Sequence, residues 1–487
     1  MISHSRLLQA CISHAESTPN KEALVSDSDV CTYFQLHDRI LRAAAFLYEM
    51  GLGKGDTILL SARKELEFVY LYFAAHALGM VNVVVDTSLN QERIEYIISL
   101  VKPKVFFTST HNEVGVSCLT YKEMNLPSEP LDFSVFPHVE SDDVADIMFT
   151  TGTTGNPKGV CLSHANIAGS AQNINSFIGN GASDVEVLGL PLSHSFGLGR
   201  LRCGLLQGST IVLLGNFANI KSFFQAIESH HATMFAMVPA VWQYIRRFSG
   251  IRIGKYASQI RFIEIGSASM GEEDKRLLMQ LFPHTRICMH YGLTEASRAF
   301  FMEFHESETD LNTIGCPSSP LVEAAVFDEE GHRVSDGECG ELCVKGNMVM
   351  NSYFLSDDNK EAFWGDYFRT GDYGYRSSSG QYYLIGRKKE VINIGGNKVS
   401  PSLIEEAIIK QGFADCACVP IPDPDGVLGE VPKAFVVKGN SEMDVHQLIT
   451  KLSSVLEPYQ VPRQIEWIEN VPRTSSGKIQ RLSLLQN

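Results

Sequence analysis

The stretch FTTGTTGNPKGV, residues 149–160, gathers the residue types best suited to holding phosphate. Four Thr and three Gly surround Lys158 within it. Glycines let backbone N–H groups turn toward an anion, threonine hydroxyls add donors, and the lysine adds a mobile positive charge. The spacing is not that of a Walker A loop, because Pro157 stands where the second glycine is needed and Gly159 follows the lysine. The pattern predicts a phosphate-binding loop, against the alternative of a Gly/Thr-rich surface turn.

Two further motifs carry groups suited to a nucleotide and a metal ion. YGLTE, residues 291–295, follows a strand pattern and offers an aromatic face for a base, the Thr294 hydroxyl, and the Glu295 carboxylate as a ligand for Mg²⁺. FRTGD, residues 368–372, places Asp372 after a glycine turn, where a carboxylate can accept hydrogen bonds from both hydroxyls of a ribose. Taken alone, the first motif also fits a strand end with a helix cap, and the second a surface turn.

A lysine near the C-terminus, Lys478, lies in PRTSSGKIQR, on a loop that contains glycine. Its position leaves two interpretations open. The lysine could be a mobile positive charge that reaches a reaction centre, or the loop could be a solvated tail.

The elements that must position these residues follow an α/β alternation. Residues 61–85 have apolar side chains at helical spacing, then a glycine, then the buried-strand run VNVVV. The alternation returns at 220–227 before ATMFAMVP and at 272–281 before TRICMHYG, which predicts parallel sheets flanked by helices. Residues 337–346, GECGELCVKG, alternate without intervening helices and predict an antiparallel sheet or small barrel.

A smaller α+β unit is expected after the turn SSSG and the strand pattern QYYLIG. It contains helix patterns at 402–411 and 445–456 and the strand patterns CACVPIP and KAFVVKG. About 100 residues suffice for a separately folded lobe. The predicted organisation is a large N-terminal domain, 1–386, of α/β sheets followed by a β part, and then a small α+β C-terminal domain, 387–487.

Composition narrows the class of protein. The chain has 487 residues, 44% hydrophobic, and a net charge of −15, which argues against a surface that coats nucleic acid and favours small-molecule partners. The eleven Cys form no C-x-x-C pair, so they predict neither a disulfide framework nor a zinc site, and the compartment looks reducing. The N-terminal segment reads as an amphipathic helix and a poor signal peptide, and no apolar run reaches the length of a bilayer. We therefore expect a cytoplasmic enzyme.

In order and spacing, the motifs resemble those of the ANL superfamily of adenylating enzymes, which comprises acyl-CoA synthetases, adenylation domains of peptide synthetases and firefly-type luciferases. The resemblance spans nearly the whole chain. The matching segments are FTTGTTGNPKGV, IGSAS, YGLTE, GELCVKG, FRTGD, IGRKKEVINIGGNKVSP and LEPYQVPRQIEWIENVPRTSSGKIQR. The resemblance implies a large N-terminal lobe made of two α/β subdomains and a small β-barrel-like subdomain, followed by a small, mobile α+β C-terminal lobe. It also implies the activation of a carboxylic acid by ATP and Mg²⁺ to an acyl-adenylate and pyrophosphate.

The resemblance also implies roles for individual residues. Lys158 would hold the terminal phosphates with the loop threonines, Tyr291 would face the adenine, Thr294 would contact the α-phosphate, and Glu295 would bind Mg²⁺. Asp372 and Arg387 would hold the ribose, and Lys478 would bridge the substrate carboxylate and the α-phosphate. The implied ATP contacts are Thr150, Thr151, Gly152, Thr153, Thr154, Lys158, Ser267, Ala268, Tyr291, Gly292, Asp372 and Arg387. The implied catalytic residues are Lys478, Thr294, Glu295 and His194.

A second state is implied for the small lobe. In the family, the residue three positions after the glycine of GRKKE is a hinge, and here that residue is Lys389. Rotation about it would withdraw Lys478 and bring a strand bearing Gly395 and Gly396 to line a tunnel for the pantetheine arm of coenzyme A. Without the resemblance, the Gly-Gly pair fits a plain hairpin.

The acid is expected to bind beside PLSHSFGLG, with His194 as a gate residue. Amino-acid-activating members carry an Asp soon after this point, whereas this chain has Ser195, Phe196 and Gly197, which argues against an α-amino acid and favours an aliphatic or aromatic acid. Arg200, Arg202 and Arg298 lie near the same segments and are interpreted as partners in surface or structural ion pairs. The alternative is that they meet a hydroxylated or second acidic group on the substrate.

The acceptor of the acyl group has two readings, coenzyme A or the phosphopantetheine thiol of a separate carrier protein, and both present the same thiol. The first is favoured because the chain carries no fused carrier domain. Two other functions stay open. One is a binding module without catalysis, which should have lost Lys478, Glu295 or Asp372. The other is a luciferase-like oxidase, but no residue in the sequence indicates oxygen chemistry.

Overall fold

A computed structural model describes residues 6–27, 29–61, 64–110, 113–150, 157–473 and 479–485. The chain divides into two compact units. The first holds the residues up to Thr150, 157–323 and 344–362, and the second holds 324–343 and the residues from Phe363 onward. The second unit thus groups strands before residue 386 with the C-terminal segment, and the boundary predicted at 386 stays a prediction.

The first unit contains a nine-stranded sheet in the order β15-β14-β13-β12-β11-β9-β10-β1-β2. Six neighbouring strands from β13 to β1 run parallel, whereas β14, β15 and β2 are antiparallel additions at the edges. The strands are β1 (Glu22–Val25), β2 (Val30–Thr32), β9 (Val185–Leu188), β10 (Thr210–Leu213), β11 (Met234–Met237), β12 (Phe262–Ile265), β13 (Arg286–Tyr291), β14 (Phe300–Glu303) and β15 (Cys316–Pro317).

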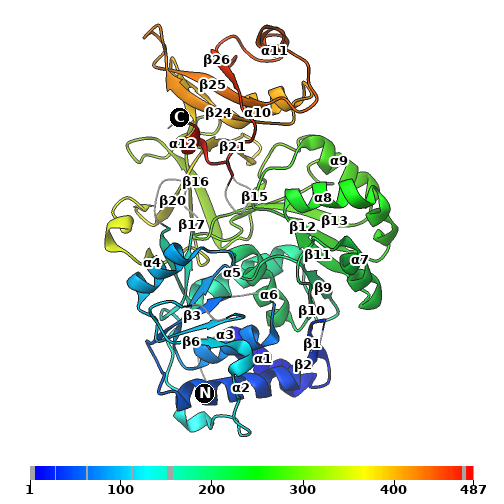
Figure 1. Ribbon diagram of the computed structural model, residues 1–487, viewed down its shortest axis with the longest axis vertical. Coiled ribbons are helices and arrows are strands. Elements are labelled where there is room, and N and C mark those ends of the chain that lie inside the picture. Colours follow the sequence, from blue (N-terminus) through cyan, green and yellow to red (C-terminus); the bar gives the residue numbers. More distant parts are fainter. Residues whose placement is uncertain are drawn as a thin grey trace. The chain divides into compact units, whose positions relative to one another are not determined.

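Helices cover this sheet as the alternating pattern predicted. Figure 1 shows α7, α8 and α9 along one side of the strands and α6 on the other. The helices predicted before ATMFAMVP and TRICMHYG are confirmed as α7 and α9. The segments are α5 (His164–Ile178), α6 (Ser195–Gln207), α7 (Ile220–Ser229), α8 (Pro239–Ser249), the 3-10 turn η3 (Arg252–Tyr256) and α9 (Glu272–Leu281).

A seven-stranded sheet completes the first unit, in the order β18-β8-β7-β4-β3-β5-β6. Strands β7, β4, β3, β5 and β6 are parallel neighbours, and β8 and β18 are antiparallel. The predicted strand VNVVV is β4, and α3, which precedes it, is apolar nearly all round because eleven of its residues are buried. The strands are β3 (Thr57–Ser61), β4 (Val81–Val85), β5 (Val105–Thr108), β6 (Cys118–Thr120), β7 (Val144–Phe149), β8 (Gly159–Ser163) and β18 (Ser352–Tyr353).

The helices around this second sheet include the amphipathic N-terminal helix that the sequence predicts. It is α1, and it buries Leu7, Leu8, Cys11 and Ala15 on one face. The segments are α1 (Arg6–Ser17), α2 (Tyr33–Glu49), α3 (Leu66–Ala77), α4 (Gln91–Val101) and the 3-10 turns η1 (Tyr121–Glu123), η2 (Phe133–Val135) and η4 (Ser356–Asn359). Among the described helices, none is both long and apolar enough to cross a membrane.

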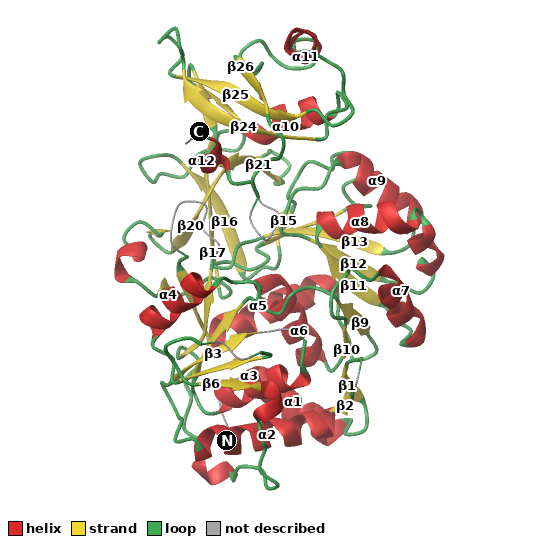
Figure 2. Ribbon diagram, in the orientation of Figure 1, coloured by secondary structure: helices red, strands yellow, loops and turns green. Residues whose placement is uncertain are grey.

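The second unit is built on small sheets, drawn as yellow arrows in Figure 2. A five-stranded sheet has the order β16-β17-β20-β19, with β21 paired antiparallel to β20. A hairpin, β22-β23, and a three-stranded sheet, β24-β25-β26, follow. The strands are β16 (Val322–Phe327), β17 (Cys339–Gly346), β19 (Phe363–Trp364), β20 (Tyr367–Arg376), β21 (Tyr382–Arg387), β22 (Ile392–Ile394), β23 (Asn397–Val399), β24 (Asp415–Pro422), β25 (Glu430–Val437) and β26 (Gln464–Trp467).

The C-terminal helices are α10 (Pro401–Ile409), α11 (Val445–Leu452) and α12 (Arg481–Leu484). Together with β24 and β25, the first two of these enclose a separate hydrophobic core. Helix α11 ends at Leu452, four residues before the predicted end, because the Ser453 and Ser454 hydroxyls donate to the carbonyls of Ile449 and Lys451 and compete with helix continuation. The fold class is the predicted one, α/β sheets followed by antiparallel strands and a small α+β part.

Several cysteines lie in strands. Cys343, Cys416 and Cys418 are buried in β17 and β24, whereas Cys339 is exposed at the start of β17. All eleven are free.

Candidate active site

The predicted phosphate loop joins the antiparallel strands β7 and β8. Phe149 stands opposite Gly159, and the Thr150 amide donates to the Lys158 carbonyl at 3.0 Å, which closes the hairpin at the base of the loop. A Cβ added to Gly159 would lie 3.1 Å from both Ile147 and Phe354, so glycine allows the close packing at this point. Thr151, Gly152, Thr153 and Thr154 lie outside the described residues.

Lys158 leaves the hairpin with its ammonium directed at two groups. Its Nζ lies 3.0 Å from Asp358 Oδ1 and 4.9 Å from the centre of the Tyr353 ring. The lysine side chain is 45% exposed, so a ligand can reach it. Neither partner was identified from the sequence, because both lie almost 200 residues further along the chain and no motif marks them.

Glu295 is the buried carboxylate predicted to bind Mg²⁺. It is 8% exposed, and its Oε1 accepts a hydrogen bond from the Tyr353 hydroxyl at 2.8 Å. Its backbone carbonyl accepts from the Met350 amide at 2.8 Å, which fixes the main chain. Within the described ranges no cluster of three or more His, Cys, Asp or Glu could hold a metal by itself. One carboxylate suits Mg²⁺, which keeps several waters and takes further ligands from substrate phosphates.

The residues predicted to hold the adenine lie at the ends of two adjacent parallel strands. β12 and β13 pair with Ile265 opposite Met289, so Ser267, Ala268, Tyr291 and Gly292 follow at one edge of the sheet. This edge, at the carboxyl ends of parallel strands, is where open α/β sheets bind ligands. Ser267 has a φ of 72°, a left-handed conformation that is unusual for a residue other than glycine. At Gly292 the close approach is decisive, because a Cβ would lie 2.3 Å from the Arg298 amide nitrogen.

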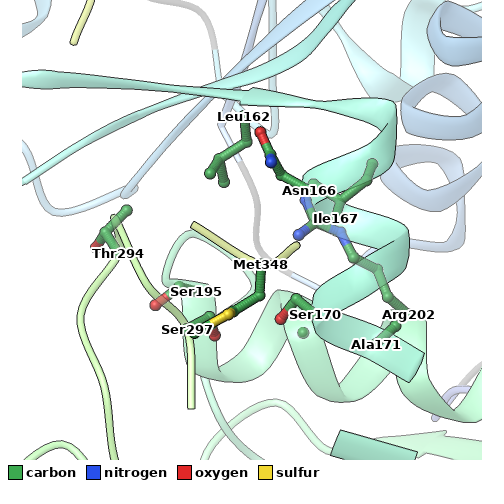
Figure 3. A pocket seen from close by; sticks show the side chains of 11 residues that line it. Leu162, Asn166, Ile167, Ser170, Ala171, Ser195, Arg202, Thr294, Ser297 and Met348 are labelled. Carbon is green, nitrogen blue, oxygen red and sulfur yellow. The ribbon is translucent and has the colours of Figure 1, made fainter. Parts of the chain in front are cut away.

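A narrow cavity opens beside Thr294, between helices α5 and α6 (Figure 3). Its volume is about 20 Å³, room for one water molecule. Its walls are mixed polar and apolar, and Met348 projects into it from the segment before β18. The lining residues are Leu162, Asn166, Ile167, Ser170, Ala171, Ser195, Gly199, Arg202, Thr294, Ser297 and Met348.

His194 immediately precedes α6, next to Ser195 in the wall of this cavity. Its Nε2 lies 3.6 Å from Asp86 Oδ2, and the same carboxylate oxygen accepts from the Ser193 hydroxyl at 2.6 Å. Burial of Asp86 tends to raise its pKa, but hydrogen bonds from Ser193 and Ser88 outweigh burial and the pKa is lowered. An ionised Asp86 therefore faces His194. No motif marks Asp86, which follows strand β4.

Two of the three arginines near the predicted acid site belong to a buried charge cluster, which we define as Glu186, Arg200, Glu264, His290 and Arg298. Arg200 pairs with Glu186 at 2.7 Å and with Glu264 at 3.2 Å, and Arg298 pairs with Glu264 at 3.0 Å. His290 contacts Glu264 at 2.7 Å, and its pKa is lowered because it is buried. With His290 neutral, the two positive and two negative charges balance.

All three arginines thus make ion pairs within the protein. Arg202 pairs with buried Asp146. Arg298 also donates to the backbone carbonyls of Ser195 at 3.1 Å and Phe196 at 2.6 Å, at the start of α6. The interpretation of all three as ion-pair partners is confirmed, and a second acidic group on the substrate has no free arginine among them to meet.

In the second unit, Asp372 and Arg387 stand opposite each other on β20 and β21. Arg387 Nε lies 2.9 Å from Asp372 Oδ1, and Arg387 also donates to the Thr370 carbonyl at 3.0 Å. Asp372 is buried, whereas the arginine side chain is 43% exposed. The pair predicted to hold a ribose is thus brought together by strand register.

The remaining predicted residues lie beyond β21. Lys389 is exposed in the turn between β21 and β22. Gly395 and Gly396 form the turn of the β22-β23 hairpin with φ values of 57° and 92°, which only glycine adopts readily. The Gly395 amide donates to the Leu428 carbonyl at 2.8 Å. Lys478 lies outside the described residues, so its role and that of the hinge stay predictions.

Comparison with protein-family models gives two matches. Residues 12–354 match the AMP-binding enzyme family, and residues 403–478 match the AMP-binding enzyme C-terminal domain. Among curated relatives, 4-coumarate–CoA ligase 3 of Arabidopsis thaliana is 27% identical, over 99% of this chain and 91% of the relative. Sulfoacetate–CoA ligase of Cupriavidus necator is 29% identical, over 90% of this chain and 88% of the relative.

Solved structures agree with these matches. The O-succinylbenzoate coenzyme A synthetase (MenE) of Bacillus subtilis, in complex with ATP and magnesium ion, superposes with a TM-score of 0.88 at 25% identity and covers 99% of each chain. ATP-bound MatB of Rhodopseudomonas palustris shares the fold, with a TM-score of 0.88, 24% identity, and coverage of 100% of this chain and 99% of that one. The chain belongs to the AMP-binding enzyme family, on the acyl-CoA synthetase branch of the ANL superfamily of adenylating enzymes, and is an AMP-forming acid–thiol ligase.

Proposed function

We propose that the protein joins a carboxylic acid to coenzyme A in two steps. The acid first attacks the α-phosphate of ATP, which gives acyl-AMP and pyrophosphate, and the thiol of coenzyme A then displaces AMP to give the thioester. The observation that carries the proposal is the contact of Tyr353 with both Glu295 and Lys158, because it places a buried carboxylate and an accessible ammonium around one side chain. A metal-binding group and a phosphate-binding group are what the first step needs.

The first step depends on position and charge. A carboxylate is a poor acyl donor because oxide would have to leave, whereas AMP leaves readily. Thr294, beside the cavity, would hold the α-phosphate, and Lys158 the terminal phosphates. Mg²⁺ on Glu295 would neutralise charge that builds up on the phosphate oxygens. Tyr291 and Ser267 would border the adenine, because they lie at the ends of β13 and β12.

The proposed acid is short and carries no α-ammonium group. The cavity beside Thr294 has a volume of about 20 Å³ and is lined by hydroxyl and amide side chains together with apolar ones, among them Leu162, Ile167 and Met348. Space for one water molecule holds neither a long acyl chain nor an aromatic ring, and the smallest acids require the least opening of its walls. The space next to α6 is filled by the buried charge cluster, which includes Arg200 of that helix. Within the predicted classes, this favours small aliphatic acids.

Coenzyme A is the proposed acceptor because the relatives named above are CoA ligases and the match covers almost the whole chain. The Gly395-Gly396 turn would let the backbone pass close to the thin pantetheine arm. The carrier-protein thiol remains the alternative acceptor. We propose the cytoplasm, where ATP and coenzyme A are available, as the compartment.

One experiment tests both the reaction and the acid. Purified protein is supplied with ATP, Mg²⁺ and single acids, from acetate and small hydroxy acids to long-chain and cinnamic-type acids, and pyrophosphate release is measured. Small acids should give the highest kcat/KM, with Glu295→Gln as the inactive control. Thioester yield is then compared between coenzyme A and a holo carrier protein. No pyrophosphate with any acid contradicts adenylation, faster turnover of long or aromatic acids contradicts the size assignment, and faster transfer to the carrier contradicts coenzyme A as acceptor.

A further inference from the structure

We propose that Tyr353 is a positioning residue of the ATP site, which aligns the Mg²⁺ carboxylate and the phosphate-binding lysine with two parts of one side chain. Its hydroxyl donates to Glu295 Oε1 at 2.8 Å, and its ring lies under the Lys158 ammonium at 4.9 Å. This inference goes beyond the proposed function, because it concerns how the two groups are held and not which acid reacts.

The backbone of Tyr353 is fixed to the hairpin that carries the phosphate loop. Tyr353 pairs with Val160 on β8, and the next amide, that of Phe354, donates to the Gly159 carbonyl at 2.7 Å. On its other side, Asn359 clamps the residue: its Oδ1 accepts from the Tyr353 amide at 2.7 Å, and its Nδ2 donates to the Tyr353 carbonyl at 3.0 Å. A side chain anchored this firmly can impose its geometry on its neighbours.

The hydroxyl contact has a direct consequence for a metal ion. Because one oxygen of Glu295 accepts a hydrogen bond from the Tyr353 hydroxyl, the carboxylate plane is fixed and the second oxygen keeps one orientation. Partners that orient a metal ligand in this way are typically worth 10- to 100-fold in metal affinity. The strand arrangement keeps this geometry before the ligand arrives, so little rotational freedom of Glu295 is lost on binding.

The ring contact acts on the other charge. The face of an aromatic ring attracts an ammonium group, so the ring of Tyr353 holds Lys158 while its hydroxyl binds Glu295. The two parts of the side chain can therefore be removed separately. Tyr353→Phe deletes the hydroxyl and keeps the ring, and Tyr353→Leu deletes both.

The test is calorimetric titration of the whole protein with ATP, once with Mg²⁺ and once with EDTA, so that no acid or turnover is needed. For Tyr353→Phe, we expect the gain in ATP affinity that Mg²⁺ provides to shrink about tenfold, while affinity in EDTA stays within about twofold. For Tyr353→Leu, affinity should fall in both conditions. Tyr244→Phe is the matched control, because Tyr244 lies on α8, outside the predicted site, and the change removes a hydroxyl that donates to the Ala218 carbonyl.

A double-mutant cycle keeps the inference testable if a variant is poorly stable. In a Glu295→Gln background, Tyr353→Phe should no longer change the effect of Mg²⁺ on ATP affinity, since the carboxylate it orients is gone. The inference is overturned if Tyr353→Phe alters ATP affinity equally with and without Mg²⁺, if it alters neither, or if its effect persists in the Glu295→Gln background. A side chain that only fills space would give one of these results.

Discussion

At the scale of single residues, Lys158 is held by its own protein before any phosphate arrives. The Asp358 carboxylate lies 3.0 Å from its ammonium, on the 3-10 turn η4. The lysine is 45% exposed and the aspartate 22%, so the pair is partly solvated and worth at most about 1 kcal/mol. A phosphate group with several negative charges can displace such a partner.

Replacement of Asp358 by Asn should therefore strengthen ATP binding in EDTA. Loss of the competing carboxylate leaves Lys158 available and removes a nearby negative charge, for an expected gain of about two- to fivefold in affinity that shrinks as salt is added. Calorimetric titration at two salt concentrations measures it. Asp357→Asn is the control, because it makes the same charge change on the same turn but its partner is Lys360, and both side chains are highly exposed. Weaker binding in Asp358→Asn would mean that Asp358 aligns the lysine and does not compete for it.

At the scale of elements, the start of helix α6 is held in place by Arg298, which follows the YGLTE segment in the sequence. Arg298 donates to the carbonyls of Ser195 and Phe196 while its Nε pairs with Glu264 on β12. The arginine has a φ of 51°, a left-handed conformation that suits few side chains and that the surrounding contacts maintain. The wall of the cavity and the loop that carries Thr294 are thereby joined.

A methyl group at Gly199 should disturb this joint. A Cβ at that position would lie 2.4 Å from Arg298 Nη1, so the guanidinium must move away from the carbonyls it binds. We expect Gly199→Ala to lower the free energy of unfolding by about 1–3 kcal/mol. Urea unfolding measures this, and Gly215→Ala, whose Cβ would meet nothing within 4 Å, should stay within about 0.5 kcal/mol of wild type. Equal stability of the two variants would show that Arg298 is free to relocate.

The packing of α5 against α3 should make stability depend on pH. His164, at the first position of α5, is buried against His76, and neither of its ring nitrogens has a hydrogen-bond partner among the described residues. Burial first, and the neighbouring His76 second, lower the pKa of His164 to about 3 from 6.5. The unfolded chain takes up this proton below pH 6.5 and the folded chain does not, so stability is complete above that pH and falls as the pH drops toward 3.

The expected slope from this group approaches ~1.4 kcal/mol per pH unit. Urea midpoints measured between pH 7 and 4 should therefore decline less steeply in His164→Gln than in wild type. The control is His138→Gln, which changes an exposed histidine paired with Glu140. Parallel profiles for wild type and His164→Gln would mean that the ring is protonated in the folded protein.

Local sequence was sufficient for elements whose pattern is regular. The helices before ATMFAMVP and TRICMHYG, the strand VNVVV and the hairpin turn at Gly395-Gly396 were predicted because periodicity and glycine punctuation are properties of neighbouring residues. Tyr353 and Asp358 were not, because their contacts with Glu295 and Lys158 depend on β18 joining the edge of a sheet formed by residues far earlier in the chain. The charge balance of the buried charge cluster could not be predicted either, because its members come from separate segments of the chain.

At the scale of the whole molecule, the predicted residues are shared between two compact units. Lys158, Thr294 and Glu295 belong to the first, and Asp372 and Arg387 to the second. A division of this kind suits an enzyme that carries out two different half-reactions, because one unit can change its contribution between them. Lys389, predicted as the hinge, belongs to the second unit, whereas Lys478, predicted as the catalytic lysine, lies outside the described residues.

The two half-reactions should respond differently to loss of Lys478. Lys478→Ala should abolish pyrophosphate release from acid and ATP, because no positive charge then bridges the carboxylate and the α-phosphate. Thioester formation from chemically prepared acyl-AMP and coenzyme A should largely survive. Lys451→Ala, an exposed lysine of α11, is the control and should leave both rates near wild type. An equal fall in both half-reactions would contradict the proposed division of labour.

The β7-β8 hairpin has a consequence for the fate of the second product. In Walker A loops the phosphates rest on the start of a helix, whose dipole is a permanent positive field. Here the predicted loop leads directly into strand β8, and α5 begins only at His164. On the role proposed for Lys158, the positive charge offered to pyrophosphate comes from a side chain that contacts Asp358 and Tyr353 in the absence of phosphate. Such a hold ends when the lysine moves, so we expect pyrophosphate to depart without any rearrangement of the sheet that carries the loop.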